Sequence, residues 1–576
     1  MKKNRRIITF LLAVLLVFGG LLMKTVIMSD FGNVKIDTIR INGTNENGEE
    51  GIIAARLYVP KSATAQTPAP GILLCPGGNA QMEYMDDLAI EYARRGYVTM
   101  VFDPYTIGRS AVITIGTDAG TISCYNYLCS LEFVNAAATG VGGHSAGVGR
   151  IKACAVDENG TSKGPLSIMN WSASTEYAYE TNANLGFSVA TWDTTRKTTP
   201  VDNVEHIVTA MGLPEGSTYE MGKWYYNDEG FGRIAYTADT WHLAALLSPT
   251  IVSQSMDFMM ETVPGSNGLD SGNLIYFWTE VFSALAFIGV FLMLFPIGDW
   301  LIETRFFSTL VRSVPEPATT ADAQFFFFLL LPGIISGFAA PWMVFNGQNI
   351  LGKLPWLNAT NTNGIVFWFV FNSILTLLIL FLRMRFDKRV DINRMKSHVS
   401  LSFIQILKTL LLGFILVGVM YLVCMLTENV FNGNVPRLWK LQLNTLTPTR
   451  LGLYLCYIPL YFFCNLVGGY SQTLGLRIKG SHSWVFTFLV WFAISLAPMI
   501  FLGRVYGTMF LGKPTLIQNV QMSRANGAMF AMIYAFLFTP FSTTHFYKKT
   551  GSFYTGAFVN SFLLCWIALA TELLRV

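Results

Sequence analysis

The chain has 576 residues, of which 52% are hydrophobic and only 13% are charged, whereas roughly a quarter of the residues of a soluble globular protein are charged. This composition excludes a single soluble domain, and the 14% aromatic content excludes a disordered chain. The net charge of +4 comes without a long basic tract, so nothing indicates a nucleic-acid-binding surface. Polar sequence extends to about Gly272 and long apolar runs follow, which predicts two different halves.

The N-terminus predicts a membrane anchor. Four cationic residues precede an apolar run from Ile7 to Met23, which at about 1.5 Å per residue is long enough to enter a bilayer. A cleaved signal peptide is the alternative, but no small-residue cleavage site follows. We therefore predict an uncleaved anchor over residues 1–28. Because cationic flanks resist translocation, both interpretations keep this end in the cytoplasm and place the following residues outside.

Residues 29–273 have the length of one α/β domain. Alternating runs at Val34–Ile41 and Ile52–Val59 flank a Gly/Asn-rich stretch and predict an antiparallel hairpin. The runs GILLC and YVTMVF, separated by a helical pattern over Met82–Arg95, predict parallel strands that are buried on both faces. A further helix is expected over Thr121–Ala137. This order of elements is typical of an α/β fold with a mostly parallel sheet.

The next motif, Gly143-His144-Ser145-Ala146-Gly147, has the form G-x-S-x-G. This pattern suits a sharp strand-to-helix turn, in which the serine has a strained backbone and the glycines let neighbouring backbone approach closely. A plain glycine-rich turn gives the same letters, so the motif alone is weak. Its context is more specific, because a strand-like run precedes it and a helical run follows. The side chain of His144 is expected to point away and to pack beside the turn.

From about Val34 to Thr262 the chain resembles the α/β-hydrolase superfamily, in particular its dienelactone-hydrolase and peptidase-like branch. Three passages carry the resemblance, namely CPGGNAQ, RRGYVTMVFDPYTIGRS and GGHSAG. The resemblance implies the α/β-hydrolase fold, with Ser145 as the nucleophile and with an acid and then a histidine further along the chain. One departure from the family is the short, glycine-rich run ATGVGG before the serine, which leaves the register of that strand open.

Two downstream positions match the acid and the histidine that the resemblance implies. His242 follows a strand-like run and precedes a helix expected to begin near Pro249, so we favour it over His206, which lies in a helical pattern. Asp193 follows an apolar strand-like run, where similar hydrolases carry the aspartate. The alternative acids are Asp202, Glu205, Asp228 and Asp239.

The implied triad of Ser145, Asp193 and His242 performs acyl transfer. The serine Oγ attacks a carbonyl carbon, the histidine accepts and returns the proton, and the aspartate orients the imidazole. Backbone N–H groups must also stabilise the oxyanion, although the run PGGN is equally compatible with a plain turn. The candidate donors are the backbone N–H groups of Ala146, Gly78 and Asn79.

Aromatic residues gather near the predicted rim of this site, where they form either an apolar acyl or aryl pocket or ordinary core and membrane-interface packing. They are Tyr105, Trp171, Trp192, Trp224, Tyr225, Tyr226 and Trp241. The eight cysteines contain no C-x-x-C pair, and Cys75 and Cys154 are expected to be buried free thiols. No phosphate-binding loop or dinucleotide motif is present, so we expect neither a cofactor nor a metal.

Residues 274–576 are predicted to form a multi-pass membrane domain of about eight helices, which gives about nine spans with the anchor. The apolar runs are Ile275–Pro296, Phe325–Val344, Ile365–Leu382, Ile404–Leu426, Leu451–Tyr470, Val485–Leu502, Ala528–Phe541 and Tyr554–Leu573. If the spans cross the membrane alternately from a cytoplasmic N-terminus, most cations of the loops fall in the cytoplasm. The exceptions, in outward loops, are Arg437, Lys440, Arg450 and Lys513. Glu280 and Glu572 fall near outer span ends, where we expect water or lipid head groups to reach them.

The sequence therefore predicts a multi-pass protein of the cell membrane with an extracytoplasmic serine hydrolase domain of esterase type. Its expected partners are a small-molecule or lipid-like acyl substrate and the membrane lipids. One alternative is a transporter or sensor whose hydrolase-like domain only binds a ligand. Another is a membrane acyltransferase, which passes the acyl group to an acceptor other than water. The triad chemistry serves esters, thioesters and amides alike.

Overall fold

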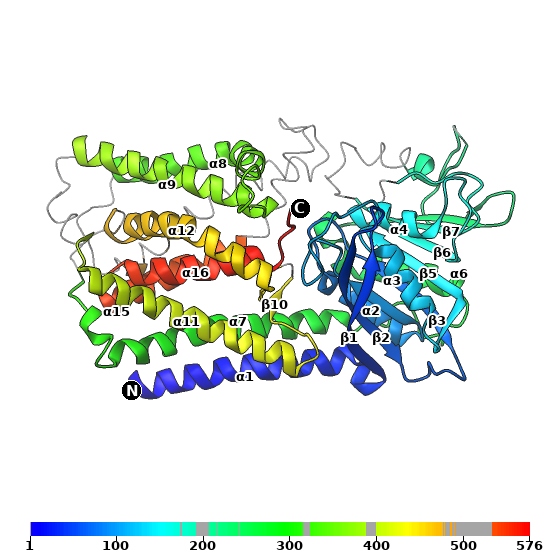
Figure 1. Ribbon diagram of the computed structural model, residues 1–576, viewed down its shortest axis with the longest axis horizontal. Coiled ribbons are helices and arrows are strands. Elements are labelled where there is room, and N and C mark those ends of the chain that lie inside the picture. Colours follow the sequence, from blue (N-terminus) through cyan, green and yellow to red (C-terminus); the bar gives the residue numbers. More distant parts are fainter. Residues whose placement is uncertain are drawn as a thin grey trace.

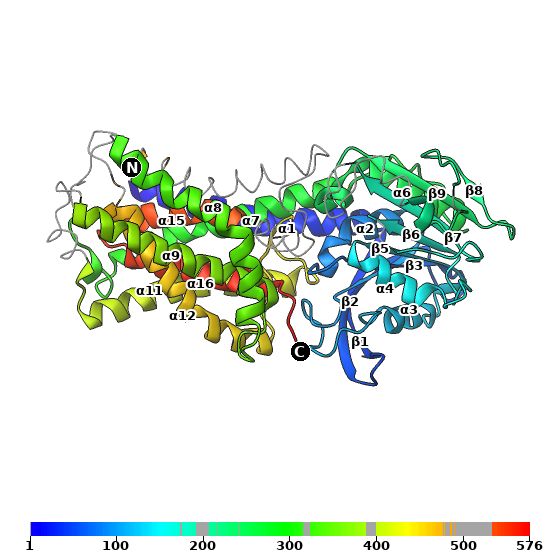
Figure 2. The ribbon, with the colours of Figure 1, turned by 90° about the horizontal axis from the view of Figure 1, so that it is seen from above.

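The computed structural model contains an α/β domain and a bundle of long helices that lie end to end (Figure 1). It describes residues 2–172, 175–191, 207–214, 216–240, 242–314, 323–386, 399–439, 441–475, 477, 484, 485, 489 and 533–576. The bundle helices run along the long axis of the molecule, and the C-terminus lies at the junction of the two parts (Figure 2).

The described strands of the α/β domain form a nine-stranded sheet in the order β1-β2-β4-β3-β5-β6-β7-β9-β8. Six of them, from β4 to β9 in this order, are mutually parallel, whereas the pairs β1–β2, β2–β4 and β8–β9 are antiparallel. The expected hairpin is confirmed as β1 and β2. The strands are β1 (Val34–Thr44), β2 (Glu50–Pro60), β3 (Ala69–Cys75), β4 (Val98–Phe102), β5 (Val134–His144), β6 (Ser167–Trp171), β7 (Asn184–Ala190), β8 (Tyr225–Tyr226) and β9 (Gly232–Ala238).

Helices cover both faces of this sheet. α2 (Asp86–Arg94) and α6 (Pro249–Thr262) pack in the hydrophobic core of one face, and α3 (Thr121–Cys129) and α4 (Ala146–Ala155) pack in that of the other. β3 is buried along its whole length because it is covered from both sides. This strand order, with a strand-turn-helix at β5 and α4, is that of the α/β-hydrolase fold.

The helix expected over Thr121–Ala137 is wrong in extent, because α3 ends at Cys129 and β5 begins at Val134. The alanines of this stretch suit helix and strand equally, so their pattern does not separate the two. β5 is longer than the expected ATGVGG run, and its register shifts opposite Pro70 and Gly71. Beyond that irregularity, regular parallel pairing with β3 and β6 defines the register up to the turn.

The described helices of the bundle are α1 (Lys2–Met28), α7 (Tyr276–Glu303), α8 (Ala323–Leu351), α9 (Thr360–Phe386), α11 (Phe403–Val430), α12 (Pro448–Tyr470), α15 (Ile533–Thr550) and α16 (Tyr554–Ala570). Five described segments are long and apolar enough to cross a membrane: Asn4–Met28, Tyr276–Glu303, Thr360–Phe386, Phe403–Val430 and Pro448–Thr473. Most of the expected span Val485–Leu502 and the first part of Ala528–Phe541 lie outside the described residues.

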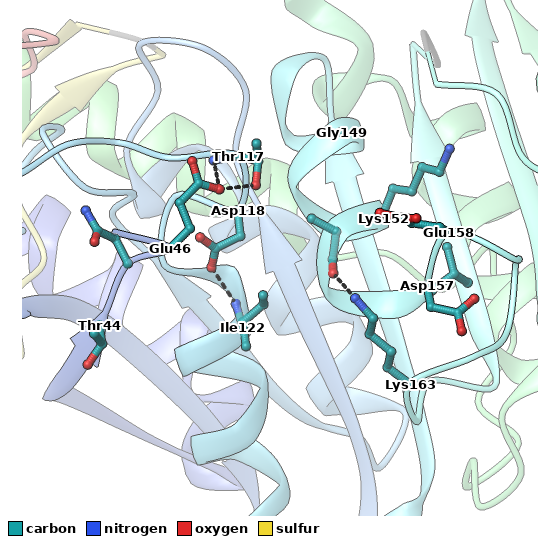
Figure 3. Close-up of a pocket in the computed structure, with 13 residues that line it drawn as sticks. Thr44, Glu46, Thr117, Asp118, Ile122, Gly149, Lys152, Asp157, Glu158 and Lys163 are labelled. Carbon is teal, nitrogen blue, oxygen red and sulfur yellow. Dashed lines mark hydrogen bonds between the residues drawn. The ribbon is translucent and has the colours of Figure 1, made fainter. Parts of the chain in front are cut away.

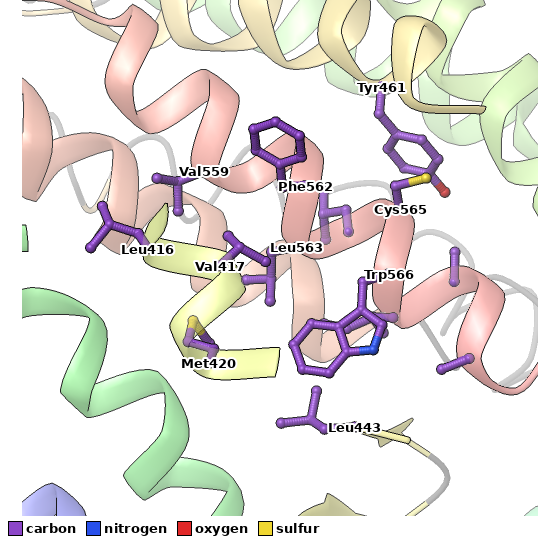
Figure 4. Close-up of a cluster of buried hydrophobic side chains, with 14 of the residues drawn as sticks. Leu416, Val417, Met420, Leu443, Tyr461, Val559, Phe562, Leu563, Cys565 and Trp566 are labelled. Atoms are coloured by element: carbon purple, nitrogen blue, oxygen red, sulfur yellow. The ribbon is translucent and has the colours of Figure 1, made fainter. Parts of the chain in front are cut away.

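The core of the bundle forms around α16, which packs against α11, α12 and α15. Its residues from Thr555 to Ala570 are all buried. Figure 4 shows Trp566, Phe562 and Leu563 of this helix beside Met420 of α11. The Nε1–H of Trp566 donates to the carbonyl oxygen of Asn444 (2.8 Å), so the one polar group of this large side chain is satisfied within the core.

Candidate active site

Ser145 occupies the sharp turn between β5 and α4. Its φ of 55° and ψ of −117° lie outside the regions that L-residues ordinarily adopt. The backbone N–H of Ser145 donates to the carbonyl oxygen of Trp171 (3.0 Å), which fixes the turn to β6. A Cβ on Gly143 would collide with the backbone of Gly147, and one on Gly147 would collide with the carbonyl group of Cys75. The motif glycines therefore permit the close approaches that create the turn.

The loop after β3 passes directly beside this turn. A Cβ on Gly77 would lie 3.2 Å from the Cβ of Ser145, and one on Gly78 would lie 3.7 Å from the Cβ of Ala146. Asn79 has a left-handed backbone with φ of 54°, which asparagine tolerates better than most residues. Within the described residues, the backbone N–H groups of Gly78, Asn79 and Ala146 donate no hydrogen bond. The three candidate oxyanion donors thus lie on the serine turn or on the loop beside it, and none of their N–H groups is used within the described residues.

His242 lies next to the serine turn. It begins the short helix η3 (His242–Leu247), four residues after the end of β9, and it is buried. The rings of His242 and His144 have their centroids 4.9 Å apart. His144 Nε2 lies 3.1 Å from the carbonyl oxygen of His242, which only accepts, so His144 Nε2 carries a proton and donates it.

His144 therefore packs beside the turn, as expected, and also holds the backbone of His242. Its ring is itself buried and contacts Tyr84 with a centroid separation of 5.3 Å. This positioning contact was missed in the sequence. The sequence offers one signal for this contact. His144 directly precedes the serine at the carboxyl end of β5, and His242 follows the carboxyl end of β9, a parallel strand of the same sheet.

The predicted acid, Asp193, lies outside the described residues, as do Asp202, Glu205 and His206. The strand before it, β7, ends at Ala190, which pairs in parallel with Ala238 of β9. The segments that lead to Asp193 and His242 thus leave the same sheet edge from adjacent strands. Of the other acids, Asp228 is exposed and accepts a hydrogen bond from Tyr179 Oη (3.0 Å), and Asp239 is an exposed residue directly after β9.

Two of the aromatic residues follow the core-packing alternative rather than the pocket. Tyr105 and Trp171 are fully buried in the core, and Trp171 Nε1 donates to Ser255 Oγ (2.8 Å). Trp224 stacks on Tyr226 and on Phe258. Trp192 and Trp241 lie outside the described residues. The aromatic content of this segment thus serves core packing at these positions. Cys75 and Cys154 are buried free thiols, as expected, and burial raises the pKa of the Cys75 thiol.

A cavity of about 620 Å³ lies on the α/β domain between α4 and the segments around Glu46 and Asp118 (Figure 3). Glu46 accepts from Thr117 Oγ1 (2.7 Å), and Asp118 accepts from the backbone N–H of Ile122 (3.0 Å). The described residues that line this cavity include neither Ser145 nor His242. The described residues contain no group of three or more His, Cys, Asp or Glu side chains placed to hold a metal ion.

The loops after β3 and β4 contact the bundle. Gln81 Nε2 donates to the carbonyl oxygen of Ala570 (3.0 Å), and Asn444 Nδ2 donates to Gln81 Oε1 (2.5 Å). The guanidinium of Arg450 donates to the carbonyl oxygens of Gly108 (3.0 Å) and Thr106 (3.3 Å). Because parallel strands end at one edge of a sheet, these loops share their edge with Ser145. The candidate site therefore stands on the edge of the α/β domain that meets the bundle.

A buried ion cluster completes this contact between the α/β domain and the bundle, which we call the joint. Arg56 pairs with Asp86 (2.6 Å), and Arg437 from the bundle bonds to Glu280 and to the carbonyl oxygen of Glu83. All except Glu280 are almost completely buried. Removing such charges from water is costly unless they are paired, as they are here.

Glu280 and Glu572, which we expected to be reached by water or lipid head groups, instead have partners within the protein. Glu280 is paired with Arg437 rather than left to water or lipid head groups. Glu572 is buried and accepts hydrogen bonds from the backbone N–H groups of Asn361 (3.1 Å) and Thr362 (2.8 Å), at the start of α9. Arg437 and Arg450, two of the four exceptions to the predicted cytoplasmic placement of loop cations, are buried partners of the α/β domain.

Burial shifts the proton affinity of carboxyl groups in this joint. Burial, and then the neighbouring Glu83, raise the pKa of Asp103 to about 6. Burial also acts to raise the pKa of Glu83, but the guanidinium groups of Arg109 and Arg56 outweigh it and hold that pKa below its ordinary value. Asp103 Oδ1 accepts from the backbone N–H of Met82 (2.8 Å), and its Oδ2 accepts from that of Arg109 (2.8 Å). Asp103 thus ties together the two loops that meet the bundle.

No protein-family model and no curated protein matches the chain. Solved structures resemble about 40% of it. A Klebsiella pneumoniae protein named as a dienelactone hydrolase is 15% identical, with a TM-score of 0.29, over 40% of this chain and 98% of its own. An α/β hydrolase from Penicillium sp. sh18 is 10% identical, with a TM-score of 0.28, over 39% and 99%. Porphyromonas gingivalis dipeptidyl peptidase 4 is 14% identical, with a TM-score of 0.29, over 40% of this chain and 36% of its own.

These scores are low, so the fold assignment rests on the strand order and on the position of Ser145 between β5 and α4. The strand order and the position of Ser145 confirm the α/β-hydrolase fold that the sequence motifs predicted. The polar segment of the chain forms a hydrolase-like domain with the α/β-hydrolase fold, joined to helices that are long and apolar enough to span a membrane.

Proposed function

We propose that this protein is a membrane-bound serine hydrolase that cleaves acyl compounds of the ester type through Ser145, His242 and Asp193. The observation that best supports this proposal is the positive-φ turn of Ser145, because the ring of the preceding residue, His144, contacts that of His242 and the loop after β3 passes beside the turn. A non-glycine residue in such a backbone conformation is costly and is found mainly at functional sites. The fold supplies the setting in which this turn presents a nucleophile.

In the proposed reaction, Ser145 Oγ attacks the substrate carbonyl carbon while His242 accepts its proton. The N–H groups of Ala146 and of Gly78 or Asn79 donate to the developing oxyanion. His242 then protonates the leaving group, which departs as an alcohol and leaves an acyl-serine. Water adds in the same way and releases the acid, while Asp193 holds the imidazole in the required tautomer.

The substrate that we propose is a small or lipid-like acyl compound that reaches the site beside the membrane. The contacts of Gln81 with Ala570 and Asn444 support this, because they place the edge that carries Ser145 against the bundle. We also propose that this end of the bundle is extracytoplasmic, since the cationic N-terminus of α1 lies at the other end. Contact with membrane lipids follows if the apolar helices span the bilayer.

A fluorophosphonate probe, which reacts with activated serines, tests the nucleophile. We expect labelling of the full-length protein in membranes, loss of label in Ser145→Ala, and labelling slower by about 100- to 10,000-fold in His242→Ala and Asp193→Asn, the range of a lost general base. Ser130→Ala, at an exposed position after α3, is the matched control and should label normally. A folded wild-type protein that takes no label would contradict the proposal and favour a ligand-binding domain of a transporter or sensor.

Product analysis separates hydrolysis from acyl transfer. An ester that labels the protein transiently should release free acid at the same rate with and without added alcohol or amine acceptors. If the acyl group appears on the acceptor and free acid falls in proportion, the enzyme is an acyltransferase that uses the same acyl-serine.

The proposed orientation is tested with a membrane-impermeant amine reagent on intact cells. The side chain of Lys35 on β1 is 73% exposed, and Lys548 is exposed at the opposite end of the bundle. We expect modification of Lys35 and protection of Lys548, with both modified after lysis. The reverse pattern would place the α/β domain in the cytoplasm.

A further inference from the structure

The end of the bundle farthest from the α/β domain contains a cavity of about 570 Å³. It lies where the N-terminal part of α1 meets the C-terminal parts of α7 and α15 (Figure 1). Four cations and one carboxylate contribute to its lining, namely Arg5, Arg6, Lys548, Lys549 and Asp299. The cavity therefore has an excess of three positive charges when its histidine, His545, is neutral. A site of this sign attracts anions.

The floor of the cavity is rigidly built. The side chain of Asp299 is only 7% exposed, and its carboxylate bonds to Arg6 Nε (3.0 Å), Lys549 Nζ (2.6 Å) and His545 Nε2 (3.0 Å). One carboxylate thus fixes three donors from two other helices. Arg6 Nη1 also bonds to Glu303 Oε1 (2.5 Å), so only part of this guanidinium is left for a ligand, whereas Lys549 keeps further N–H groups.

The rim carries cations that have no carboxylate partner. Arg5 and Lys548 are exposed, and neither forms an ion pair within the part of the chain that the structure describes. Lys548 Nζ lies 4.7 Å from the centre of the Trp484 ring, and the guanidinium of Arg477 lies 4.2 Å from the centre of the same ring. Tryptophan at the end of an apolar helix bundle is typical of the depth of lipid head groups.

An apolar surface continues from this rim along α1. Ile8, Leu12 and Leu15 follow Arg5 at three, seven and ten residues, which places them on the same face of the helix. They are 64%, 46% and 67% exposed. A ligand bound at Arg5 therefore meets a cationic pocket at one end and a bare apolar stripe at the other. This combination fits a molecule with an anionic head and a hydrocarbon tail.

We propose that this cavity binds the phosphate-bearing head group of an anionic membrane lipid, with an acyl chain lying along Ile8, Leu12 and Leu15. The guanidinium fork of Arg5 suits the paired oxygens of a phosphodiester. Arg6, whose Nε and Nη1 bond to Asp299 and Glu303, adds positive charge beside it, as do Lys548 and Lys549. Basic pockets between spanning helices bind such head groups. The site is separate from Ser145 and does not depend on the proposed hydrolase reaction.

Binding of fluorescent phosphatidylglycerol to the full-length protein in neutral detergent micelles tests this site. Unlabelled phosphatidylglycerol, phosphatidylcholine and inorganic phosphate serve as competitors. The variant is Arg5→Gln with Lys548→Gln, two exposed positions whose change leaves the Asp299 contacts in place. The matched control is Arg305→Gln with Lys408→Gln, which removes the same charge near the same end but outside the cavity lining.

We expect phosphatidylglycerol to compete far better than the other two, and the cavity variant to bind about 30-fold more weakly, since each cation at an anionic lipid surface is worth about 1 kcal/mol and tenfold is about 1.4 kcal/mol. The control pair should change affinity by less than about threefold. Equal competition by phosphatidylcholine would remove the head-group selectivity and overturn the proposal. Equal competition by inorganic phosphate would show a free-anion site instead, and an equal loss in the control would show only diffuse attraction.

Discussion

The two ends of the helical bundle both collect cations, but they use them in opposite ways. At the end that meets the α/β domain, Arg437 and Arg450 are buried and bonded to carboxylates or carbonyl oxygens of both parts. At the other end, Arg5 and Lys548 are exposed and face a cavity. A buried charge requires partners, whereas an exposed one is solvated and free to meet a ligand. The first end is thus a fixed joint beside the candidate active site, and the second is an accessible binding surface.

The largest expected difference between the two ends comes from removing one cation at each. Arg437→Met leaves the half-buried carboxylate of Glu280 and the buried carbonyl oxygen of Glu83 without their partner, so we expect a loss of about 3–5 kcal/mol in the free energy of unfolding. Arg6→Met removes a partly exposed cation from Asp299, which keeps Lys549 and His545, and from the exposed Glu303, which water can solvate, so we expect a loss of about 1 kcal/mol or less. Thermal unfolding of the full-length protein in detergent measures both, and equal losses would contradict the comparison.

The joint should also respond to pH through Asp103. Its pKa is about 6 in the folded protein and about 3.9 in an unfolded chain, so the folded state holds the proton more tightly. The stabilisation from protonated Asp103 is complete below about pH 4 and is lost as the pH rises through about 6, by up to about 3 kcal/mol. We therefore expect the stability of the wild type relative to Asp103→Asn to fall between about pH 4 and about pH 6.5 and to stay level above that range. A difference that stays constant over this range would rule out this titration.

A smaller effect is expected on reactivity rather than on stability. Gln81→Ala removes the hydrogen bonds to Asn444 and to the carbonyl oxygen of Ala570 that hold the loop with the candidate oxyanion donors. Each such bond contributes about 1 kcal/mol, so we expect fluorophosphonate labelling to slow by about tenfold while Lys548→Gln leaves the rate unchanged. Asn444→Ala should act in the same direction as Gln81→Ala. Unchanged labelling in both would show that the joint does not position the site.

The smallest effect is expected for Arg5→Gln. In detergent without anionic lipid, an exposed cation without an ion-pair partner in the described residues should change the free energy of unfolding by less than about 0.5 kcal/mol. Added phosphatidylglycerol should stabilise the wild type more than this variant, because a ligand stabilises the state that binds it. Unfolding midpoints with and without the lipid measure the difference, and equal stabilisation of both proteins would argue against a role for Arg5.

Local patterns predicted much of the α/β domain. The hairpin, the buried strands β3 and β4 and the turn at Ser145 each follow from periodicity or from glycines at close contacts, which are properties of neighbouring residues. The helix expected over Thr121–Ala137 was too long because alanines and asparagine in Val134–Ala138 fit either structure. The placement of Asp193 stays a prediction.

The joint could not be predicted, because its partners are far apart in the sequence. Arg437 bonds to the carbonyl oxygen of Glu83 across 354 positions, and Gln81 bonds to that of Ala570 across 489. A cation in an outward loop looks like any solvated lysine or arginine until its partner is known. Counting loop charges therefore could not show that Arg437 and Arg450 are buried partners of the α/β domain, unlike the exposed cations at the opposite end of the bundle.

The most direct test of the proposed function is to identify the residue that a fluorophosphonate modifies in the full-length protein. Mass spectrometry of the intact chain and of its peptides should show a single phosphonate per chain, on Ser145, with no adduct in Ser145→Ala. An adduct on another serine, or no adduct on a protein that remains folded, would contradict the assignment of Ser145 as an activated nucleophile.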